Sequence, residues 1–213
     1  MKINILTLFP EMFEGPFNHS IVKRAQKKKL VDLAIHNLRD WAADKHKSVD
    51  DRPFGGGAGM LLKVDIIDRA LKDLKTKKLK NSKIVLLDAG GKTFDQKMAV
   101  NLSKLDNLTL IAGHYEGVDY RVHQHLVNGV ISIGNYVLTG GEIAAMVVVD
   151  TVVRLIPKVI DPESLKEESF SIKNLNVEYP QYTRPEVYKG WRVPKVLLSG
   201  NHKKILEWRK KQK

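Results

Sequence analysis

Short apolar runs recur along the first part of the chain, and each run ends in a glycine or a turn. They cover residues 2–9, 83–87, 108–112 and 130–133. Runs such as IVLL and LTLIA have no polar alternation, which is typical of strands buried on both faces. Helical stretches, for example 64–74 and 94–105, separate them. Strands alternating with helices predict an α/β fold with a largely parallel sheet and helices on both faces.

Three of these predicted strands lead into loops that carry glycine. The loops cover residues 88–91, 113–117 and 134–141. Ligands of parallel sheets bind beyond the carboxyl ends of the strands, and glycine lets the backbone turn sharply and approach a ligand closely. Together the three loops predict a small-molecule site.

Two common phosphate-binding motifs do not account for these loops. Gly91-Lys92-Thr93 matches the end of a P-loop, but that motif needs glycine five residues before its Gly-Lys pair, where this chain has Leu86. The pattern GxGxxG is also absent as a strand-to-helix turn. We therefore expect neither a Walker site nor a standard dinucleotide site.

The character of the chain changes after residue 160. Residues 161–170 are polar and acidic and contain a proline, which is typical of a linker. The remainder is aromatic and basic and ends in a helix predicted from His202. We expect an N-terminal domain over residues 1–160, a flexible linker over 161–175 and a small, basic, helical domain over 176–213.

The net charge of the chain indicates what kind of molecule it binds. The chain has 36 Lys and Arg against 24 Asp and Glu, a formal charge of +12, and 43% hydrophobic residues. In a folded chain this excess favours a polyanionic partner, although a generally basic proteome produces the same excess. Charge alone does not distinguish RNA from DNA or an anionic membrane.

Other compositional features exclude several classes of protein. There is no cysteine, which excludes disulfides, thiolate nucleophiles and Cys-ligated zinc, and which fits a reducing cytosol. The first residues predict a strand and a turn rather than a secretory signal. The longest apolar stretch, 143–160, carries Asp150, Arg154 and Lys158, too many charges for a membrane span.

A second glycine-rich segment lies outside the predicted strand ends. Gly55-Gly56-Gly57-Ala58-Gly59 follows Asp50, Arg52 and Phe54. It is either a flexible connector or a backbone surface that lies against nucleic acid or a cofactor, with Arg52 near a phosphate. His46, between two lysines, adds positive charge upstream.

Residues 132–142, SIGNYVLTGGE, carry the most specific signal. The segment joins a predicted strand to a helix and mixes three glycines with Tyr136 and Leu138. Its backbone groups can read an adenine edge while its apolar side chains cover the adenine faces. It resembles the S-adenosylmethionine (SAM) loop of the SPOUT methyltransferases, whose sheet forms a deep trefoil knot.

The resemblance extends over nearly the whole chain. Six further segments occur in the order seen in the bacterial tRNA (guanine-N1)-methyltransferase, or TrmD, family. They are DDRPFGGGAGM (50–60), AGHYEGVDYRV (112–122), RLIP (154–157), EESF (167–170), YTRPEV (182–187) and LLSGNH (197–202). Seven matching segments in register are a specific indication of this family.

The resemblance implies a SPOUT-type knotted parallel sheet and a small helical C-terminal domain. It implies transfer of a methyl group from SAM to N1 of the guanine immediately 3′ of the tRNA anticodon. It further implies a cytoplasmic homodimer with its active site at the subunit interface, stimulation by magnesium without metal ligands that we can assign, and neither a membrane nor DNA as partner.

The family's binding positions can be carried onto this chain. The cofactor-binding positions fall on Leu86, Leu87, Gly113, Ile133, Gly134, Asn135, Tyr136, Val137, Leu138, Gly140 and Gly141. The substrate-binding positions fall on His46, Asp50, Arg52, Gly55, Gly59, Tyr115, Glu116, Arg184, Ser199, Asn201 and His202.

Guanine methylation at N1 needs a base and a stabiliser of negative charge. N1 attacks well only as its proton leaves, and a carboxylate within hydrogen-bonding reach can accept that proton. Charge then develops on O6, where a guanidinium is well suited to stabilise it. The resemblance assigns these roles to Glu168 and Arg154. From the residues alone, the alternative interpretation is that Glu168 is a solvated acid of the linker and that Arg154 forms an ion pair with Asp150 on the same helix.

The chain departs from the family pattern at several positions. Glu168 stands where the family usually has aspartate, with Glu167 as an alternative base; His114 replaces an arginine, and Asn135 replaces an aspartate. The chain ends soon after Trp208 and Arg209, where relatives continue, so we expect a short C-terminal domain.

These departures keep two alternative functions open. One is a non-catalytic SAM- and RNA-binding relative, and the other is a sibling SPOUT enzyme with another RNA target. A generic basic RNA-binding module is less favoured, because the chain has no RNP-type strand or other RNA-binding signature.

Overall fold

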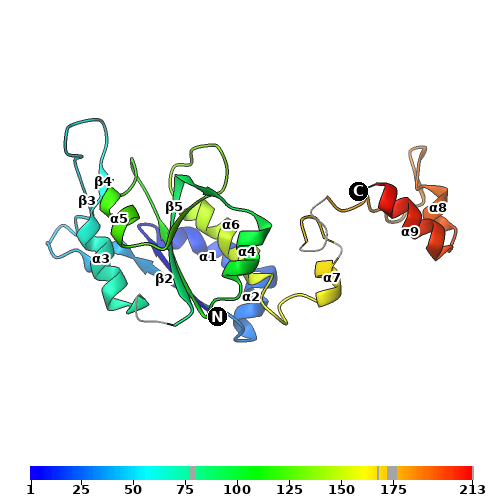
Figure 1. The fold of residues 1–213 in the computed structure, drawn as a ribbon, viewed down its shortest axis with the longest axis horizontal. Coiled ribbons are helices and arrows are strands. Elements are labelled where there is room, and N and C mark those ends of the chain that lie inside the picture. Colours follow the sequence, from blue (N-terminus) through cyan, green and yellow to red (C-terminus); the bar gives the residue numbers. More distant parts are fainter. Residues whose placement is uncertain (77–79, 167, 172–176, 213) are drawn as a thin grey trace. The chain divides into compact units, whose positions relative to one another are not determined.

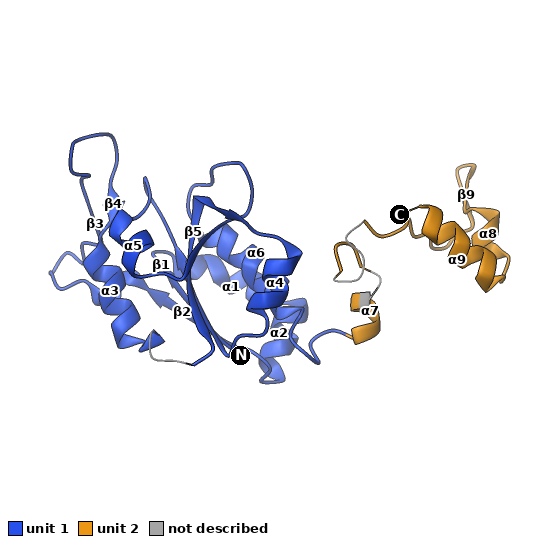
Figure 2. Cartoon of the chain, in the orientation of Figure 1, with its two compact units in different colours: residues 1–160 blue, residues 161–213 orange. Residues whose placement is uncertain are grey.

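A computed structural model describes residues 1–76, 80–166, 168–171 and 177–212 (Figure 1). The chain forms two compact units, residues 1–160 and residues 161–213 (Figure 2). In the part of the chain that the structure describes, no helix is long and apolar enough to cross a membrane.

A five-stranded parallel sheet forms the centre of the first unit. Its strand order is β2-β1-β6-β5-β7, and every neighbouring pair is parallel. The central strands are buried almost throughout, which explains their unbroken apolar sequences. The strands are β1 (Lys2–Thr7), β2 (Asp32–Asn37), β5 (Ser82–Thr93), β6 (Asn107–Ala112) and β7 (Gly129–Ser132).

Helices cover both faces of this sheet and form a separate apolar core with each face (Figure 1). One core includes η1 (Pro10–Phe13), α1 (Glu14–Phe17), α2 (Ser20–Lys27), α4 (Gln96–Leu102) and α6 (Glu142–Val153). The other includes η2 (Leu38–Trp41), α3 (Val64–Asp73) and α5 (Tyr120–His125). The α/β fold class predicted from the sequence is therefore confirmed.

The glycine-rich segment is the loop of a short hairpin at one edge of this unit. Strands β3 (Asp50–Asp51) and β4 (Leu61–Leu62) pair antiparallel on either side of it. Leu62 N donates to Gly117 O at 3.0 Å, and Glu116 N donates to Met60 O at 3.1 Å. These bonds join the hairpin to the loop after β6.

The second unit contains short elements. They are α7 (Pro162–Lys166), β8 (Val187–Tyr188), β9 (Trp191–Arg192), α8 (Lys195–Leu198) and α9 (His202–Lys211). The helix predicted from His202 is α9. Asn201 caps it, since Oδ1 accepts a hydrogen bond from Lys204 N at 3.1 Å.

His36 of β2 gives the fold a predictable acid sensitivity. Its Nε2 lies 3.1 Å from Oδ1 of the buried Asn4. Burial lowers the pKa of His36 below its usual value of 6.5, and the nearby charge of Lys2 lowers this pKa further. The unfolded chain therefore takes up this proton more readily than the folded chain. Neutral His36 therefore contributes to the free energy of unfolding. This contribution is complete above pH 6.5 and is lost as the pH falls toward the pKa of His36 in the folded chain.

We expect His36→Gln to make the fall in Tm between about pH 7.5 and pH 5.5 shallower than in the wild type, because glutamine takes up no proton. Thermal melts across this range measure the effect, with His19→Gln as a control at an exposed site. Equal slopes for His36→Gln and the wild type would contradict the assignment.

Candidate functional site

A pocket of about 190 Å³ opens beside the carboxyl ends of β6 and β7. Its third side is β5, whose pairing register with β7 shifts between Leu87 and Lys92. The lining comes from residues 87–89, 113–117, 131–134 and 136–141, with Ala144 of α6. Two of the glycine-bearing loops singled out in the sequence, 113–117 and 134–141, thus meet at one cavity. The third predicted loop, 88–91, is instead part of β5, and only Asp88 and Ala89 of this segment line the pocket.

Two adjacent glycines hold the walls of this pocket together. Gly141 N donates a hydrogen bond to Gly113 O at 2.7 Å. A Cβ atom on Gly141 would lie 2.8 Å from both Ala112 Cα and Gly113 N, so the two loops pack backbone against backbone. A Cβ atom on Gly140 would lie 2.5 Å from Nδ1 of His114. Around Gly141 the pocket wall therefore consists of peptide groups, which can bind a ligand closely.

Most of the expected cofactor-binding residues line this pocket. They are Leu87, Gly113, Ile133, Gly134, Tyr136, Val137, Leu138, Gly140 and Gly141. Leu86 and Asn135 are not among the lining residues. Leu86 is fully buried in the core on the opposite face of the sheet from Leu87, because successive strand residues point to opposite faces. Asn135 is exposed.

Several lining residues were not singled out as binding positions. They are Asp88, Ala89, His114, Gly117, Ile131, Ser132, Thr139 and Ala144. For most of them, a position at the end of a predicted strand or in the loop that follows it is the signal that points to them; Ala144, in α6, has no such signal. Asp88 and Glu116 bring two carboxylates to the pocket, which makes its edge suitable for a ligand with positive charge.

A buried carboxylate supports the wall behind His114. Glu142, in the first turn of α6, is 1% exposed, and its Oε1 accepts a hydrogen bond from Thr7 Oγ1 at 2.7 Å. Its Oε2 lies 3.7 Å from Nδ1 of His114. The His114 ring also packs against Phe9 at a centroid distance of 4.8 Å. These contacts fix the position of His114, and the start of a helix is favourable for the Glu142 charge.

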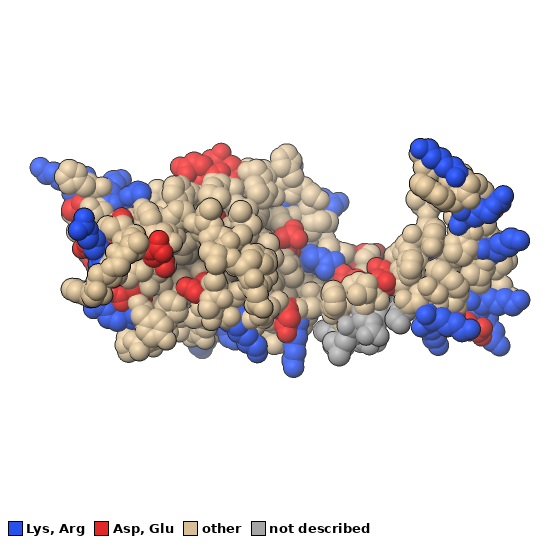
Figure 3. Space-filling model, turned by 90° about the horizontal axis from the view of Figure 1, so that it is seen from above, with Lys and Arg blue, Asp and Glu red and all other residues tan. Residues whose placement is uncertain are grey.

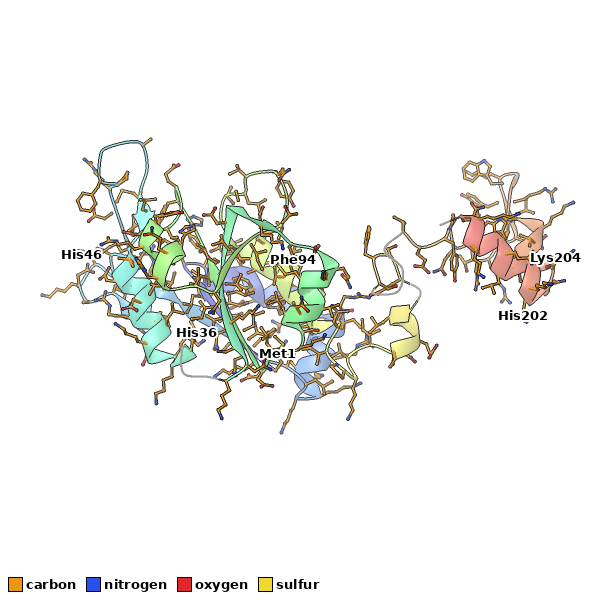
Figure 4. All side chains as sticks on the ribbon, in the orientation of Figure 1. Met1, His36, His46, Phe94, His202 and Lys204 are labelled. Carbon is orange, nitrogen blue, oxygen red and sulfur yellow. The ribbon has the colours of Figure 1, made fainter. Side chains whose placement is uncertain are left out.

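Some of the expected substrate-binding residues of the first unit meet at the pocket edge. Tyr115 and Glu116 line the pocket, and Gly59 is so close that a Cβ atom there would overlap the Glu116 side chain. Asp50 lies in β3, where it pairs with Leu62 of β4, and does not line the pocket. The other three lie in exposed segments and are His46, labelled in Figure 4, together with Arg52 and Gly55.

The remaining site residues lie elsewhere in the chain. Arg154 ends α6 in the first unit and is partly buried. The second unit contains Glu168, which is partly buried and whose carbonyl oxygen accepts a hydrogen bond from Ser171 N at 3.3 Å. It also contains Arg184, Ser199, Asn201 and His202. Glu167, the alternative base, lies outside the described residues.

The fold and the pocket are those of an α/β protein with a candidate small-molecule site at the carboxyl ends of parallel strands. A family model described as "tRNA (Guanine-1)-methyltransferase TrmD" matches residues 1–213. The chain therefore belongs to the TrmD family of tRNA (guanine-1)-methyltransferases, and the resemblance seen in the sequence is confirmed. It is accordingly a methyltransferase enzyme.

Individual relatives agree with this family. The chain is 54% identical over 213 residues to the tRNA (guanine-N(1)-)-methyltransferase of Dictyoglomus turgidum, covering all of this chain and 84% of the relative. It is 53% identical over 212 residues to the protein of the same name from Dehalococcoides mccartyi, covering 100% and 85%. It is 54% identical over 213 residues to that of Carboxydothermus hydrogenoformans, covering 100% and 82%.

Proposed function

We propose that this chain transfers a methyl group from SAM to N1 of the guanine immediately 3′ of the tRNA anticodon. The observation that carries the proposal is the glycine-walled pocket at the strand ends in a member of this family. The close approach of Gly140 and Gly141 to the facing loop creates a cradle that side chains would fill. Asp88 and Glu116 suit a cationic ligand such as SAM.

The pocket residues position the donor, and two other side chains act on guanine. When bound, SAM supplies a methyl group activated by a cationic sulfonium. The Glu168 carboxylate accepts the N1 proton as guanine attacks, because N1 is a weak nucleophile while it keeps that proton. The Arg154 guanidinium stabilises the negative charge that develops on O6. Apolar side chains such as Leu138 exclude water from the donor.

In this proposal, residues of each unit contact the tRNA. In the first unit, the hairpin loop with Gly59 adjoins Tyr115 and Glu116, where the target guanine enters. In the second unit, basic side chains outnumber acidic ones on the face that Figure 3 shows, and Arg184, Ser199, Asn201 and His202 contribute to tRNA binding. We also propose that residues 1–160 are the SAM-binding domain and residues 176–213 the tRNA-binding domain; of the linker expected between them, residues 167 and 172–175 lie outside the described residues.

We further propose a cytoplasmic homodimer with a knotted sheet and the active site at the subunit interface. The apolar surface of α6 supports the dimer, since Ile143 is 46% exposed and Val147 is 40% exposed. The family resemblance also implies that magnesium stimulates the activity. Within the described residues, no group of three or more His, Asp or Glu side chains could hold a metal ion, so we assign it no ligands and no step.

The test is methyl transfer from labelled SAM to an unmodified tRNA transcript with guanine 3′ of the anticodon. We expect label in this transcript and none in a matched transcript with adenine at that position. Label in both would favour a sibling enzyme with another target. Binding of SAM and tRNA without transfer would favour a non-catalytic relative.

A further inference from the structure

The β8–β9 hairpin presents two large aromatic side chains to solvent. Trp191 is 72% exposed and Tyr188 is 53% exposed, and the two are direct partners across the antiparallel pair. Their ring centroids are 5.8 Å apart and tilted by 59°. Exposed aromatic pairs of this kind are uncommon on free surfaces and indicate a binding surface.

The turn of this hairpin holds the aromatic pair in place. Lys189 and Gly190 connect the strands, and both have positive φ, at 50° and 85°. Two-residue hairpin turns with positive φ at both positions match the twist of the strands and fix their register. Val193 N donates to Glu186 O at 3.0 Å and extends the pairing beyond the aromatic residues. The pair is therefore prepositioned, so binding costs little side-chain entropy.

Other aromatic residues of this unit have a different environment. Tyr179 lies under the Arg209 guanidinium at 4.6 Å, and Tyr182 and Trp208 have ring centroids 6.4 Å apart. Trp208 and Tyr179 are only partly exposed. The Tyr179 and Trp208 rings contribute to the packing of the unit. Tyr182 is 51% exposed and lies beside Trp208, whereas Trp191 has most of its side chain in solvent.

The charge around the hairpin indicates the kind of partner. Residues 182–212 contain nine lysines and arginines and two acids, Glu186 and Glu207, a net charge of 9 − 2 = +7. Lys189 Nζ lies 5.5 Å from the centre of the Tyr188 ring, and Arg192 follows Trp191 directly. Figure 3 shows several basic side chains along the visible outline of this unit. Exposed aromatic rings among basic side chains are typical of surfaces that bind unpaired nucleotides.

We propose that this hairpin binds an unpaired nucleobase of the tRNA. The base stacks on Trp191, with Tyr188 beside it, while Lys189 and Arg192 contact the flanking phosphates. The inference rests on the proposed function and deepens it, because it names the side chains and the chemistry that hold the substrate. Trp191 and Tyr188 are binding residues, not catalytic ones.

The test measures binding of the full chain to a fluorescently labelled, unmodified tRNA transcript. We expect Trp191→Ala to weaken binding about tenfold or more, since removing one stacking side chain commonly has this effect. Trp191→Phe should retain most of the affinity because it keeps a ring. Leu206→Ala, at an exposed apolar residue of the same unit without a ring, is the matched control and should bind as the wild type does.

Salt dependence and fluorescence separate stacking from charge. Trp191→Ala should weaken binding at every salt concentration with an unchanged slope of log Kd against log salt. Arg192→Gln should reduce this slope by about one. Tryptophan emission should be quenched when tRNA binds to the wild type, and most of the quenching should disappear in Trp191→Phe.

Two outcomes would overturn the inference. One is wild-type affinity in Trp191→Ala, and the other is a loss of oligomer mass in this variant on sedimentation, which would make the hairpin a contact between protein chains. Methyl transfer by the wild type is assayed in parallel. If it is specific for guanine while Trp191→Ala binds normally, the hairpin inference fails alone. If the wild type neither binds nor methylates tRNA, both proposals fail.

Discussion

Replacing Glu168 by alanine is expected to lower the rate of methyl transfer by about 10²- to 10⁴-fold, the usual contribution of a general base. The guanine N1 proton then has no positioned acceptor, so the attacking nitrogen remains protonated. The affinity for SAM should not change, because Glu168 does not line the pocket. Single-turnover methylation of the guanine transcript and equilibrium binding of SAM measure the two quantities.

Two further variants make this prediction specific. Glu168→Asp restores the side chain that the family usually carries and should keep substantial activity, since it changes the reach of the carboxylate and not its chemistry. Glu163→Ala removes another acid of the second unit and should leave the rate unchanged. If Glu168→Ala stays within a few-fold of the wild type, another group is the base.

Replacing Gly141 by alanine is expected to have the second large effect, on the pocket itself. The new methyl group would lie 2.8 Å from Ala112 Cα and Gly113 N, and backbone atoms cannot rotate away as a side chain can. The loops must separate, which weakens the 2.7 Å hydrogen bond from Gly141 N to Gly113 O. Overpacking of this kind costs about 1–3 kcal/mol of folding free energy. SAM binding should weaken too, by roughly tenfold for each 1.4 kcal/mol by which the substitution destabilises the SAM-bound state more than the free state.

Denaturant unfolding and calorimetric titration with SAM measure these two losses. Gly129→Ala is the matched control, because a Cβ atom there meets nothing within 4 Å and lies outside the pocket. It should leave SAM affinity unchanged. Unaltered SAM binding in Gly141→Ala would show that the pocket tolerates a wider gap between its loops.

The sequence was most informative about features that depend on local pattern. Unbroken apolar runs predicted the parallel strands because both faces of the central strands are covered. The glycines after these strands predicted a pocket, because carboxyl ends of parallel strands lie along one edge. Which of two neighbouring leucines faces the pocket was not evident. Leu86 and Leu87 are equally apolar, and only their membership of two separate cores, one on each face of the sheet, distinguishes them.

Contacts between distant segments had no signal in a single sequence. Thr7 and Glu142 are 135 positions apart, and nothing local to either residue indicates that they share a buried hydrogen bond. The hairpin at residues 187–192 had a weak signal, a Lys-Gly pair between two short apolar segments. Its importance became visible only with the exposure of Trp191. The roles of Glu168 and Arg154 came from the resemblance together with the chemistry of guanine, and they stay predictions.

The peptide wall of the pocket also has a consequence for mutational escape from inhibitors. Every amino acid except proline carries the same main-chain donor and acceptor, so a point mutation rarely deletes a hydrogen bond made to such a wall. A competitor that binds free main-chain groups of the loops around Gly113 and Gly141 meets a target whose polar pattern side-chain substitutions do not change. Substitutions such as Gly141→Ala disturb the pocket itself, so tolerated resistance is expected at exposed lining residues, where Tyr136 is 55% exposed and Val137 is 87% exposed. Inhibitors that do not contact these two side chains should therefore be affected by the fewest single amino-acid substitutions.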